Sequence, residues 1–579
     1  MQYFIPAWYQ NGDWKENEQV WYRSRTVTEF DDTVKQIQLF FRKKAAPFKI
    51  MQLGFSPNFR HFLHRQGVYH IPYWSCFDAM QGIASDRTVL FSFHDLSWPD
   101  DVEFIYSPFA VIVRRNQKKY AQIEFAEDGN MFRVDMFKND DRICSNFYDD
   151  RGFMSCQIVY RDGIAYREQY FNEDGVWKFA RFLDDGHVLI NPDSSWYFVN
   201  LNDQKHESPY HADDQKPESS NHANDRKPES SRHADDQKPE SSNNVNNRKP
   251  EYPGKVNYQR LEYPDIDAMI TEVVQENLKT TSDEDIFVIA VHPLHSPVLT
   301  QVMKNRKTVL SFFARRLDEN GIEEMDRKLM QDADAIVADK NVTARRIQEQ
   351  TGLRKPVRVI TPYDSREESG NSLHLPVQNI LLAVDQIDDE DFNTLVVLLA
   401  NYILTRNHRA RVCMFTRSSE YNRKSRLMHK ARKALRAARM NPELAREDDK
   451  VSESRLDFQE QAACVFSVAQ CVDEMTVSQK LREQRIVVDL QPVPDQFLQI
   501  SAMSMGIPQI AGQETDYFAD GKNGILVRNL SDLPDALDYY LGSIAHVNQA
   551  QIASYELGSR FSTEQLVQSW KEILENVEH

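Results

Sequence analysis

Residues that could carry out chemistry are few in this sequence, and their spacing specifies no reaction. His292 and His295 stand close together, directly after the apolar run Ile286–Val291. Such a pair could bind a metal ion or act in acid–base catalysis, but without further ligands it is more often structural. We therefore expect no metal site and no cofactor. Three aspartates also lack the helical spacing that would pair two carboxylates: Asp78, Asp95 and Asp101.

The overall charge argues against a nucleic-acid-binding protein. The 579 residues include 70 Lys and Arg against 87 Asp and Glu, a net charge of −17. Proteins with this balance are repelled by phosphate backbones and anionic membranes. The exception is a basic helical pattern around Asn422–Ala438. In so acidic a chain, we interpret it as a solvated face or a partner contact rather than a nucleic-acid site.

The sequence shows neither the pattern of a secretory signal nor that of a membrane-spanning segment. The longest helix-like apolar stretch, Leu395–Leu404, has about half of the ~20 residues that a membrane span needs. The first residues contain no cationic lead before an apolar segment. The six cysteines are scattered without a C-x-x-C pair, which is typical of buried thiols in a reducing compartment. We expect a cytoplasmic protein.

The elements that would position these residues alternate between helices and strands at both ends of the chain. Thr28–Lys43 has helical periodicity, and Phe48–Leu53, Thr88–Phe93 and Phe109–Val113 have the composition of strands. The alternation resumes after Pro253 and continues into a second α/β unit. Strands that alternate with helices favour parallel sheets covered on both faces, so the fold class is α/β.

The middle of the chain interrupts this pattern. From Ala121 to Pro192, turn pairs such as Asp162-Gly163 recur every 10 to 12 residues between runs of alternating polarity. This pattern predicts an antiparallel β-meander. An 11-residue tandem repeat follows, with copies that begin at His211, His222 and His233. Because each copy contains Pro and Ser-Ser but no large apolar residue, we expect the repeats to be disordered.

These patterns divide the chain into five parts. A first Rossmann-like domain is split by the meander and the repeats, and a second one follows. The expected ranges are 1–115 and 255–372 for the split domain, 116–200 for the meander, 201–254 for the repeats, and 373–579 for the C-terminal domain with its terminal helix.

The segment Gln496–Tyr540 resembles the C-terminal half of GT-B glycosyltransferases. That family has the pattern E-G-F-G-x-x-x-L-E-A-M-A-x-G-x-P-V, followed by G-x-N-G-x-L-V. Matching residues in this sequence are Ala502, Met503, Gly506, Pro508, Gly521, Asn523, Gly524, Leu526 and Val527. The resemblance implies a GT-B-like pair of doubly wound Rossmann-type domains, with the meander inserted in the first.

The same resemblance implies a degenerate donor site. Active members hold the donor with two glutamates eight residues apart, and Val493 and Ser501 stand at those positions. They neutralise the diphosphate with an Arg and a Lys, which Gln386 and Asp391 replace here. We expect the neighbouring carboxylates of residues 388–391 to face the diphosphate position without a cation. Departure of a diphosphate needs positive charge, so we expect no catalysis.

Taken over nearly its full length, the chain resembles the first accessory secretion protein of the accessory Sec system of Gram-positive bacteria. The resemblance implies a non-catalytic cytosolic component that supports export of serine-rich-repeat adhesins. The implied partners are two sibling accessory proteins, the adhesin preprotein and the dedicated translocation ATPase, with membrane contact only through the translocon. It also implies that the meander contacts the substrate or the siblings. The alternative is an active retaining glycosyltransferase that modifies the Ser/Thr-rich adhesin.

Overall fold

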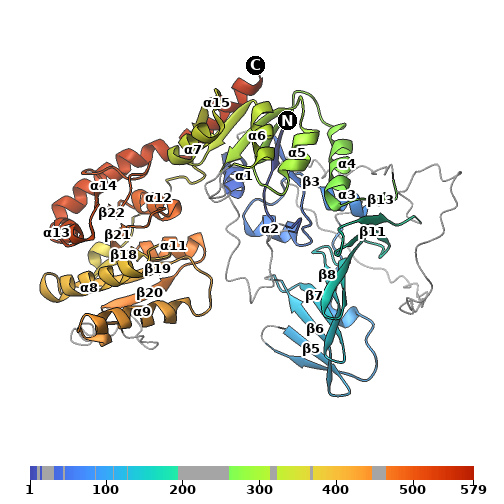
Figure 1. Ribbon diagram of the computed structural model, residues 1–579, viewed down its shortest axis with the longest axis horizontal. Helices are drawn as coiled ribbons and strands as arrows, with labels where there is room; N and C mark the ends of the chain where they lie inside the picture. The colour runs from blue at the N-terminus through green and yellow to red at the C-terminus, as the bar shows by residue number, and fades with distance from the viewer. Residues whose placement is uncertain are drawn as a thin grey trace, which may run out of the picture.

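The computed structural model describes residues 1–9, 13–15, 32–43, 46–84, 87–107, 110–126, 128–192, 260–312, 322–365, 369–445 and 465–578. Two parallel sheets covered by helices form the N-terminal and C-terminal domains, and a long antiparallel sheet extends away from the N-terminal domain (Figure 1). The fold is therefore α/β, as predicted. The repeats at 201–254 lie outside the described residues, so their expected disorder stays a prediction.

The N-terminal domain contains a seven-stranded parallel sheet in the order β17-β16-β15-β14-β1-β2-β3. Helices α3, α4, α5 and α6 pack on one face, and α1, α2 and α15 pack on the other. The strands are β1 Gln2–Ile5, β2 Phe48–Gln52, β3 Tyr73–Ser75, β14 Ile286–Ala290, β15 Lys307–Phe312, β16 Ala335–Ala338 and β17 Val357–Val359. The helices are α1 Asp32–Lys43, α2 Phe59–Arg65, α3 Cys76–Gln81, α4 Ile266–Leu278, α5 Ser296–Val302, α6 Glu324–Asp332 and α7 Asn341–Thr351.

The antiparallel sheet has ten strands that pair in chain order from β4 to β13. Its strands are β4 Val102–Tyr106, β5 Ala110–Arg115, β6 Lys118–Phe125, β7 Met131–Lys138, β8 Asp141–Tyr148, β9 Met154–Arg161, β10 Ile164–Phe171, β11 Trp177–Phe182, β12 Val188–Ile190 and β13 Glu262–Tyr263. The predicted meander is confirmed. Phe179 and Tyr170 on one face stack against each other and pack on Phe77 of α3, which joins the sheet to the N-terminal core.

The C-terminal domain repeats the doubly wound design with a six-stranded parallel sheet in the order β20-β19-β18-β21-β22-β23. Helices α8, α9 and α13 cover one face, and α11 and α12 cover the other. The strands are β18 Gln378–Ala383, β19 Ala410–Thr416, β20 Phe466–Gln470, β21 Gln484–Asp489, β22 Gln509–Ala511 and β23 Gly524–Leu526. The helices are α8 Asp389–Thr405, α9 Arg423–Ala437, α11 Glu474–Leu481, α12 Gln496–Ser504, α13 Leu533–Leu541, α14 Ile544–Gly558 and α15 Thr563–Glu578.

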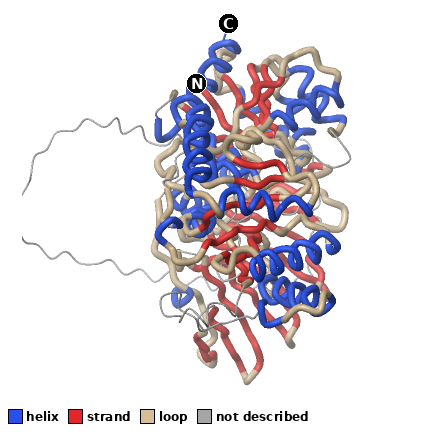
Figure 2. Tube along the Cα trace, turned by 90° about the vertical axis from the view of Figure 1, so that its left-hand side faces the viewer, coloured by secondary structure: helices blue, strands red, loops and turns tan. Residues whose placement is uncertain are grey.

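The last helix leaves the C-terminal domain and packs on the N-terminal one. Trp570 of α15 is 1% exposed and contacts Phe40 of α1 edge-to-face, with ring centroids 5.9 Å apart. Both termini consequently lie at the same end of the molecule (Figures 1 and 2). The terminal helix thus connects the two domains through its packing on α1.

Two sequence expectations about the N-terminal region are wrong. The apolar run at Phe109–Val113 is predicted to lie in the parallel sheet, but Ala110–Arg115 pairs antiparallel with β4 and β6. The antiparallel sheet therefore begins at Val102, before the expected boundary at residue 116. Thr88–Phe93 forms no strand; its end begins a short 3-10 helix, Phe93–Asp95, capped by Ser92. Apolar composition alone cannot distinguish a strand of a parallel sheet from one of an antiparallel sheet.

Candidate functional site

A hollow lies where the two domains meet. It has a volume of about 330 Å³ and is lined by residues that follow β16 in the N-terminal domain and β18, β19 and β21 in the C-terminal domain. The carboxyl ends of parallel strands are the usual ligand position in doubly wound sheets. The lining residues of this interdomain pocket are Asp339, Lys340, Tyr363, Ala383, Asp385, Gln386, Phe415, Arg417, Gln491, Val493, Pro494, Asp495, Gln496 and Phe497.

Charges of both signs line the interdomain pocket. The Asp385 carboxylate accepts hydrogen bonds from Thr416 Oγ1 and Arg417 N, and it pairs with Arg423 Nη2 at 3.1 Å. The Arg417 guanidinium lies 3.9 Å from Asp495 Oδ2, and its Cζ is 5.7 Å from the centre of the Phe497 ring. The interdomain pocket therefore contains two cations, Lys340 and Arg417, while the expectation of a diphosphate position without a cation stays a prediction. Lys340 and Arg417 come from different domains, so only the domain pairing brings them together.

Of the four predicted donor-site positions, two line the interdomain pocket and two do not. Gln386 and Val493 line the pocket, and the Gln386 backbone N–H donates to Gln491 Oε1 at 2.9 Å. Ser501 is 2% exposed within α12 and does not line the pocket. Asp391 lies in the first turn of α8. The structure therefore brings together two of the four positions.

The acidic residues at the start of α8 cap the helix and do not line the pocket. Asp388 Oδ1 accepts from the Asp391 backbone N–H at 2.8 Å, and Asp389 pairs with Lys430 Nζ at 2.6 Å. Carboxylates at a helix N-terminus stabilise the positive end of the helix dipole. None of residues 388–391 lines the interdomain pocket, and the expectation that they face a diphosphate stays a prediction.

A buried carboxyl group supports the floor of the pocket. Asp489, at the end of β21, is 1% exposed, and burial raises its pKa to about 7. Its Oδ1 accepts from Gln491 Nε2 at 3.1 Å, and its Oδ2 accepts from the Asp495 backbone N–H at 3.1 Å. These bonds hold the loop that leads from β21 into α12. No pattern in the sequence distinguishes this aspartate from a solvated one.

Hydrogen bonds join the two domains to each other beside the pocket. Gln496 Nε2, at the start of α12, donates to the Asp339 carbonyl oxygen at 3.1 Å and to Tyr517 Oη at 2.7 Å. The Asn341 backbone N–H donates to Asp516 Oδ2 at 3.2 Å. Burial raises the pKa of the Tyr517 hydroxyl, so it stays neutral as a hydrogen-bonding group. These hydrogen bonds connect the two domains beside the pocket.

The histidine pair has a structural arrangement. His295 is fully buried; its Nε2 lies 2.7 Å from the Ala290 carbonyl oxygen and its Nδ1 lies 2.9 Å from Tyr9 Oη. His292 Nδ1 accepts from the Leu294 backbone N–H at 3.1 Å. Within the described part of the chain, no group of three or more His, Cys, Asp or Glu side chains could hold a metal ion.

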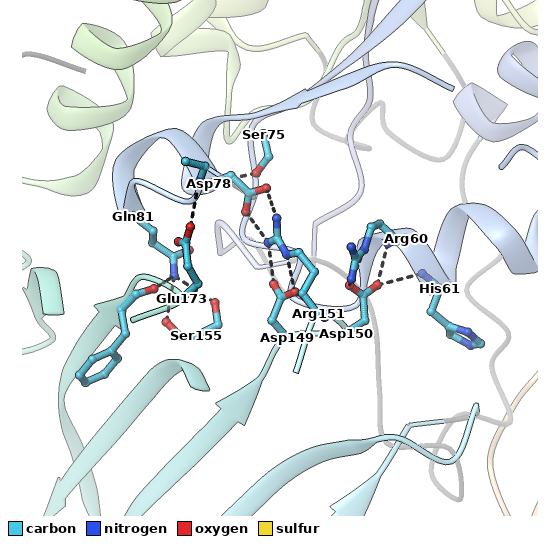
Figure 3. Close-up of polar contacts among 12 residues, drawn as sticks. Arg60, His61, Ser75, Asp78, Gln81, Asp149, Asp150, Arg151, Ser155 and Glu173 are labelled. Carbon is cyan, nitrogen blue, oxygen red and sulfur yellow. Dashed lines mark hydrogen bonds and ion pairs between the residues drawn. The ribbon is translucent and has the colours of Figure 1, made fainter. Parts of the chain in front are cut away.

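A second group of polar residues fixes the antiparallel sheet to the N-terminal domain (Figure 3). Arg151, in the turn between β8 and β9, is 7% exposed; its Nη atoms donate to both Asp78 oxygens, each at 2.8 Å. Its Nε and Nη2 also donate to Asp149, at 2.7 and 2.8 Å. Next to it, Asp150 accepts from the backbone N–H groups of Arg60 and His61 at the start of α2. The turn between β8 and β9 is therefore joined to both α2 and α3.

The antiparallel sheet has one open edge among the described residues. At one end, β13 is covered, because Tyr263 is fully buried beside α4. At the other end, β4 pairs only with β5. The Ser107 N–H donates inward to the Ala110 carbonyl oxygen. Because N–H directions alternate along a strand, those of Phe104 and Tyr106 point away from β5.

Comparisons with known proteins agree with this geometry. A sequence profile of the family of accessory Sec system protein 1 matches residues 1–209 and 226–577. A Streptococcus gordonii protein described as the same accessory Sec system component is 26% identical over 583 residues, which cover 99% of each chain. No described helix is both long and apolar enough to cross a membrane.

Solved structures show the same architecture. A chain in the crystal structure of accessory secretory proteins 1, 2 and 3 of Streptococcus pneumoniae is 25% identical, with a TM-score of 0.74 and coverage of 100% of this chain and 99% of that one. The pneumococcal O-GlcNAc transferase GtfA, solved with UDP and GlcNAc, is 12% identical with a TM-score of 0.59, over 100% of this chain and 99% of that one. The second likeness shows the GT-B fold and nothing about activity.

Proposed function

This chain belongs to the family of accessory Sec system protein 1, and from that premise we propose that it is a non-catalytic component of the accessory Sec export complex. It binds two sibling accessory proteins and the serine-rich-repeat adhesin in the cytoplasm. Support for the siblings comes from the pneumococcal relative, which was solved together with accessory secretory proteins 2 and 3. Contact with the dedicated translocation ATPase brings the adhesin to the membrane.

The pocket chemistry supports the non-catalytic part of this proposal, and it is the observation that carries it. The donor-holding glutamates are replaced by exposed Val493 and buried Ser501, neither of which can hold sugar hydroxyls as a carboxylate does. Gln386 and Asp391 supply no positive charge to a leaving diphosphate. Catalysis of sugar transfer depends on such preorganised charge, so its loss removes the largest contribution to the rate.

One observation favours the second candidate function, an active retaining glycosyltransferase. Lys340 and Arg417 line the pocket and could neutralise a diphosphate. However, the Arg417 guanidinium already faces a carboxylate, Asp495 Oδ2, at 3.9 Å. Asp385 is paired with Arg423, and the two remaining lining carboxylates, Asp339 and Asp495, equal the two lining cations in number. A diphosphate would therefore enter a pocket whose cations are already balanced by carboxylates.

We place the adhesin on the open edge of the antiparallel sheet. An extended Ser-rich chain lacks large apolar side chains, so its backbone is the group that a binding site can recognise. Strand addition to an edge uses backbone hydrogen bonds in this way. The outward N–H groups of Phe104 and Tyr106 offer such a pairing, and the Arg151 contacts hold the sheet in a fixed direction.

Replacing Tyr106 by proline tests this placement. The change removes one outward N–H and, since the Tyr106 side chain is 63% exposed, leaves the core intact. Loss of this bond and of the adjacent pairing should weaken binding of a Ser-rich adhesin fragment by about tenfold, measured by fluorescence anisotropy with the full chain. Tyr106→Thr, which keeps the N–H, is the matched control and should bind as the wild type does. Equal binding by the proline and threonine variants would contradict the placement.

A further inference from the structure

The most basic element of this acidic protein borders an open groove. Helix α9 contains seven Lys or Arg side chains and no Asp or Glu. Among the described residues, three of these side chains form ion pairs: Arg423 with Asp385, Arg426 with Glu420, and Lys430 with Asp389. Two further basic side chains of the helix, Lys433 and Arg436, are exposed to solvent.

The groove lies between α8 and α9, away from the interdomain pocket. It has a volume of about 760 Å³. Its apolar floor comes from Val397 and Leu398 of α8, Ala437 of α9, and Met440, which follows α9. On α8 the lining runs from Asp389 to Asn401, about 18 Å at 1.5 Å per residue. That length matches about three turns of a helix.

Lys430 and Lys433 stand on the rim of this groove. The Lys430 ammonium lies 4.1 Å from the centre of the Phe392 ring, which fixes its position beside the apolar floor. The alanine side of α9 leaves room for a second helix to approach, and the lysines attract acidic residues that flank its apolar stripe. An amphipathic helix seated by apolar anchors at i, i+4 and i+7 is a common occupant of such grooves.

From this combination we propose that the α8–α9 groove docks an acidic amphipathic helix of a partner protein. The apolar stripe of the partner lies on Val397, Leu398 and Met440, and its carboxylates pair with Lys433. Lys430 is already paired with Asp389, which also lines the groove, and contributes its stem to the rim. The proposal does not depend on the adhesin edge at β4, which lies in a different domain. It gives the basic helix a role other than binding of nucleic acid.

The test uses the full chain and a labelled helical peptide with leucine at i, i+4, i+7 and i+11 and glutamate at the flanking positions. We expect binding in fluorescence anisotropy, weakened about tenfold by Lys433→Glu because one attraction becomes a repulsion. Ala437→Trp should abolish binding by filling the groove. Lys522→Glu, on an exposed turn of the same domain, makes the same change in net charge and should have less than about a twofold effect.

Five results would overturn the proposal. The peptide fails to bind the wild type, or it binds the Lys433→Glu variant equally well. A version of the peptide with lysine in place of glutamate binds as tightly, which would remove the charge argument. Lys433→Glu abolishes binding to phosphatidylglycerol vesicles or to a single-stranded oligonucleotide but not to the peptide. Light scattering shows self-association that depends on Lys433, which would assign the groove to a second copy.

Discussion

Replacing Arg151 by alanine is expected to lower the free energy of unfolding by about 3 to 5 kcal/mol. The guanidinium is buried and makes four hydrogen bonds to two carboxylates, Asp78 and Asp149. Without it, two negative charges at the junction would face each other with no cation between them. The antiparallel sheet should detach from the N-terminal domain before the rest unfolds. Chemical denaturation followed by tryptophan fluorescence measures the effect.

The control for Arg151 is Arg115→Ala, in β5 of the same sheet. Arg115 pairs with Asp101 at 2.8 Å, but both side chains are exposed. Exposed ion pairs contribute little, so this variant should denature as the wild type does. The double variant Arg151→Ala with Asp78→Ala should recover part of the lost stability by removing one unpaired charge. Equal stability of Arg151→Ala and Arg115→Ala would show that the junction does not hold the sheet.

Replacing Asp489 by asparagine is expected to change how stability depends on pH. Burial raises the folded-state pKa of Asp489 from 3.8 to about 7. Between these values the folded protein keeps the proton and the unfolded chain loses it, so stability falls as pH rises, by up to about 1.4 kcal/mol per pH unit. Above about pH 7 the carboxyl group is ionised in both the folded and the unfolded state, so stability no longer falls with pH. The asparagine variant cannot ionise, so this contribution disappears.

Denaturation midpoints at about pH 5, 6, 7 and 8 measure this difference. At about pH 8 the variant should gain about 3 kcal/mol over the wild type, after about 1 kcal/mol is lost with one of the hydrogen bonds that Asp489 accepts. Asp101→Asn, an exposed carboxyl group, should follow the wild-type pH dependence. If the difference between Asp489→Asn and the wild type does not grow across this pH range, the carboxyl group is ionised in the folded protein throughout.

Local patterns predict the parts of the fold that depend on neighbouring residues. The turn glycines Gly129, Gly163, Gly175 and Gly186 all adopt positive φ, as the Asp-Gly pairs between short strands indicate. The second α/β unit is predicted for the same reason, since its buried strands and amphipathic helices have distinct periods. Strand β5 is assigned to the wrong sheet because its apolar run fits either type of sheet.

Features that depend on distant segments could not be predicted. Helix α15 has an apolar face, but nothing local indicates that Trp570 packs on the N-terminal domain. Lys340 and Arg417 belong to different domains and meet only because the strand ends face each other across the pocket. The carboxylates at 388–391 look like pocket residues in the sequence, whereas they cap α8. Which charged residues line the interdomain pocket therefore follows from the arrangement of the two domains, and the sequence alone does not show it.

The most direct test of the non-catalytic assignment is a sugar-transfer assay with the purified full chain. It uses a panel of labelled nucleotide sugars and a Ser-rich adhesin fragment as acceptor. We expect incorporation at the level of a buffer control, because no carboxylate stands at Val493 or Ser501 and the pocket cations are balanced by carboxylates. Acceptor-dependent transfer that Arg417→Ala abolishes would contradict the account and identify the chain as a glycosyltransferase.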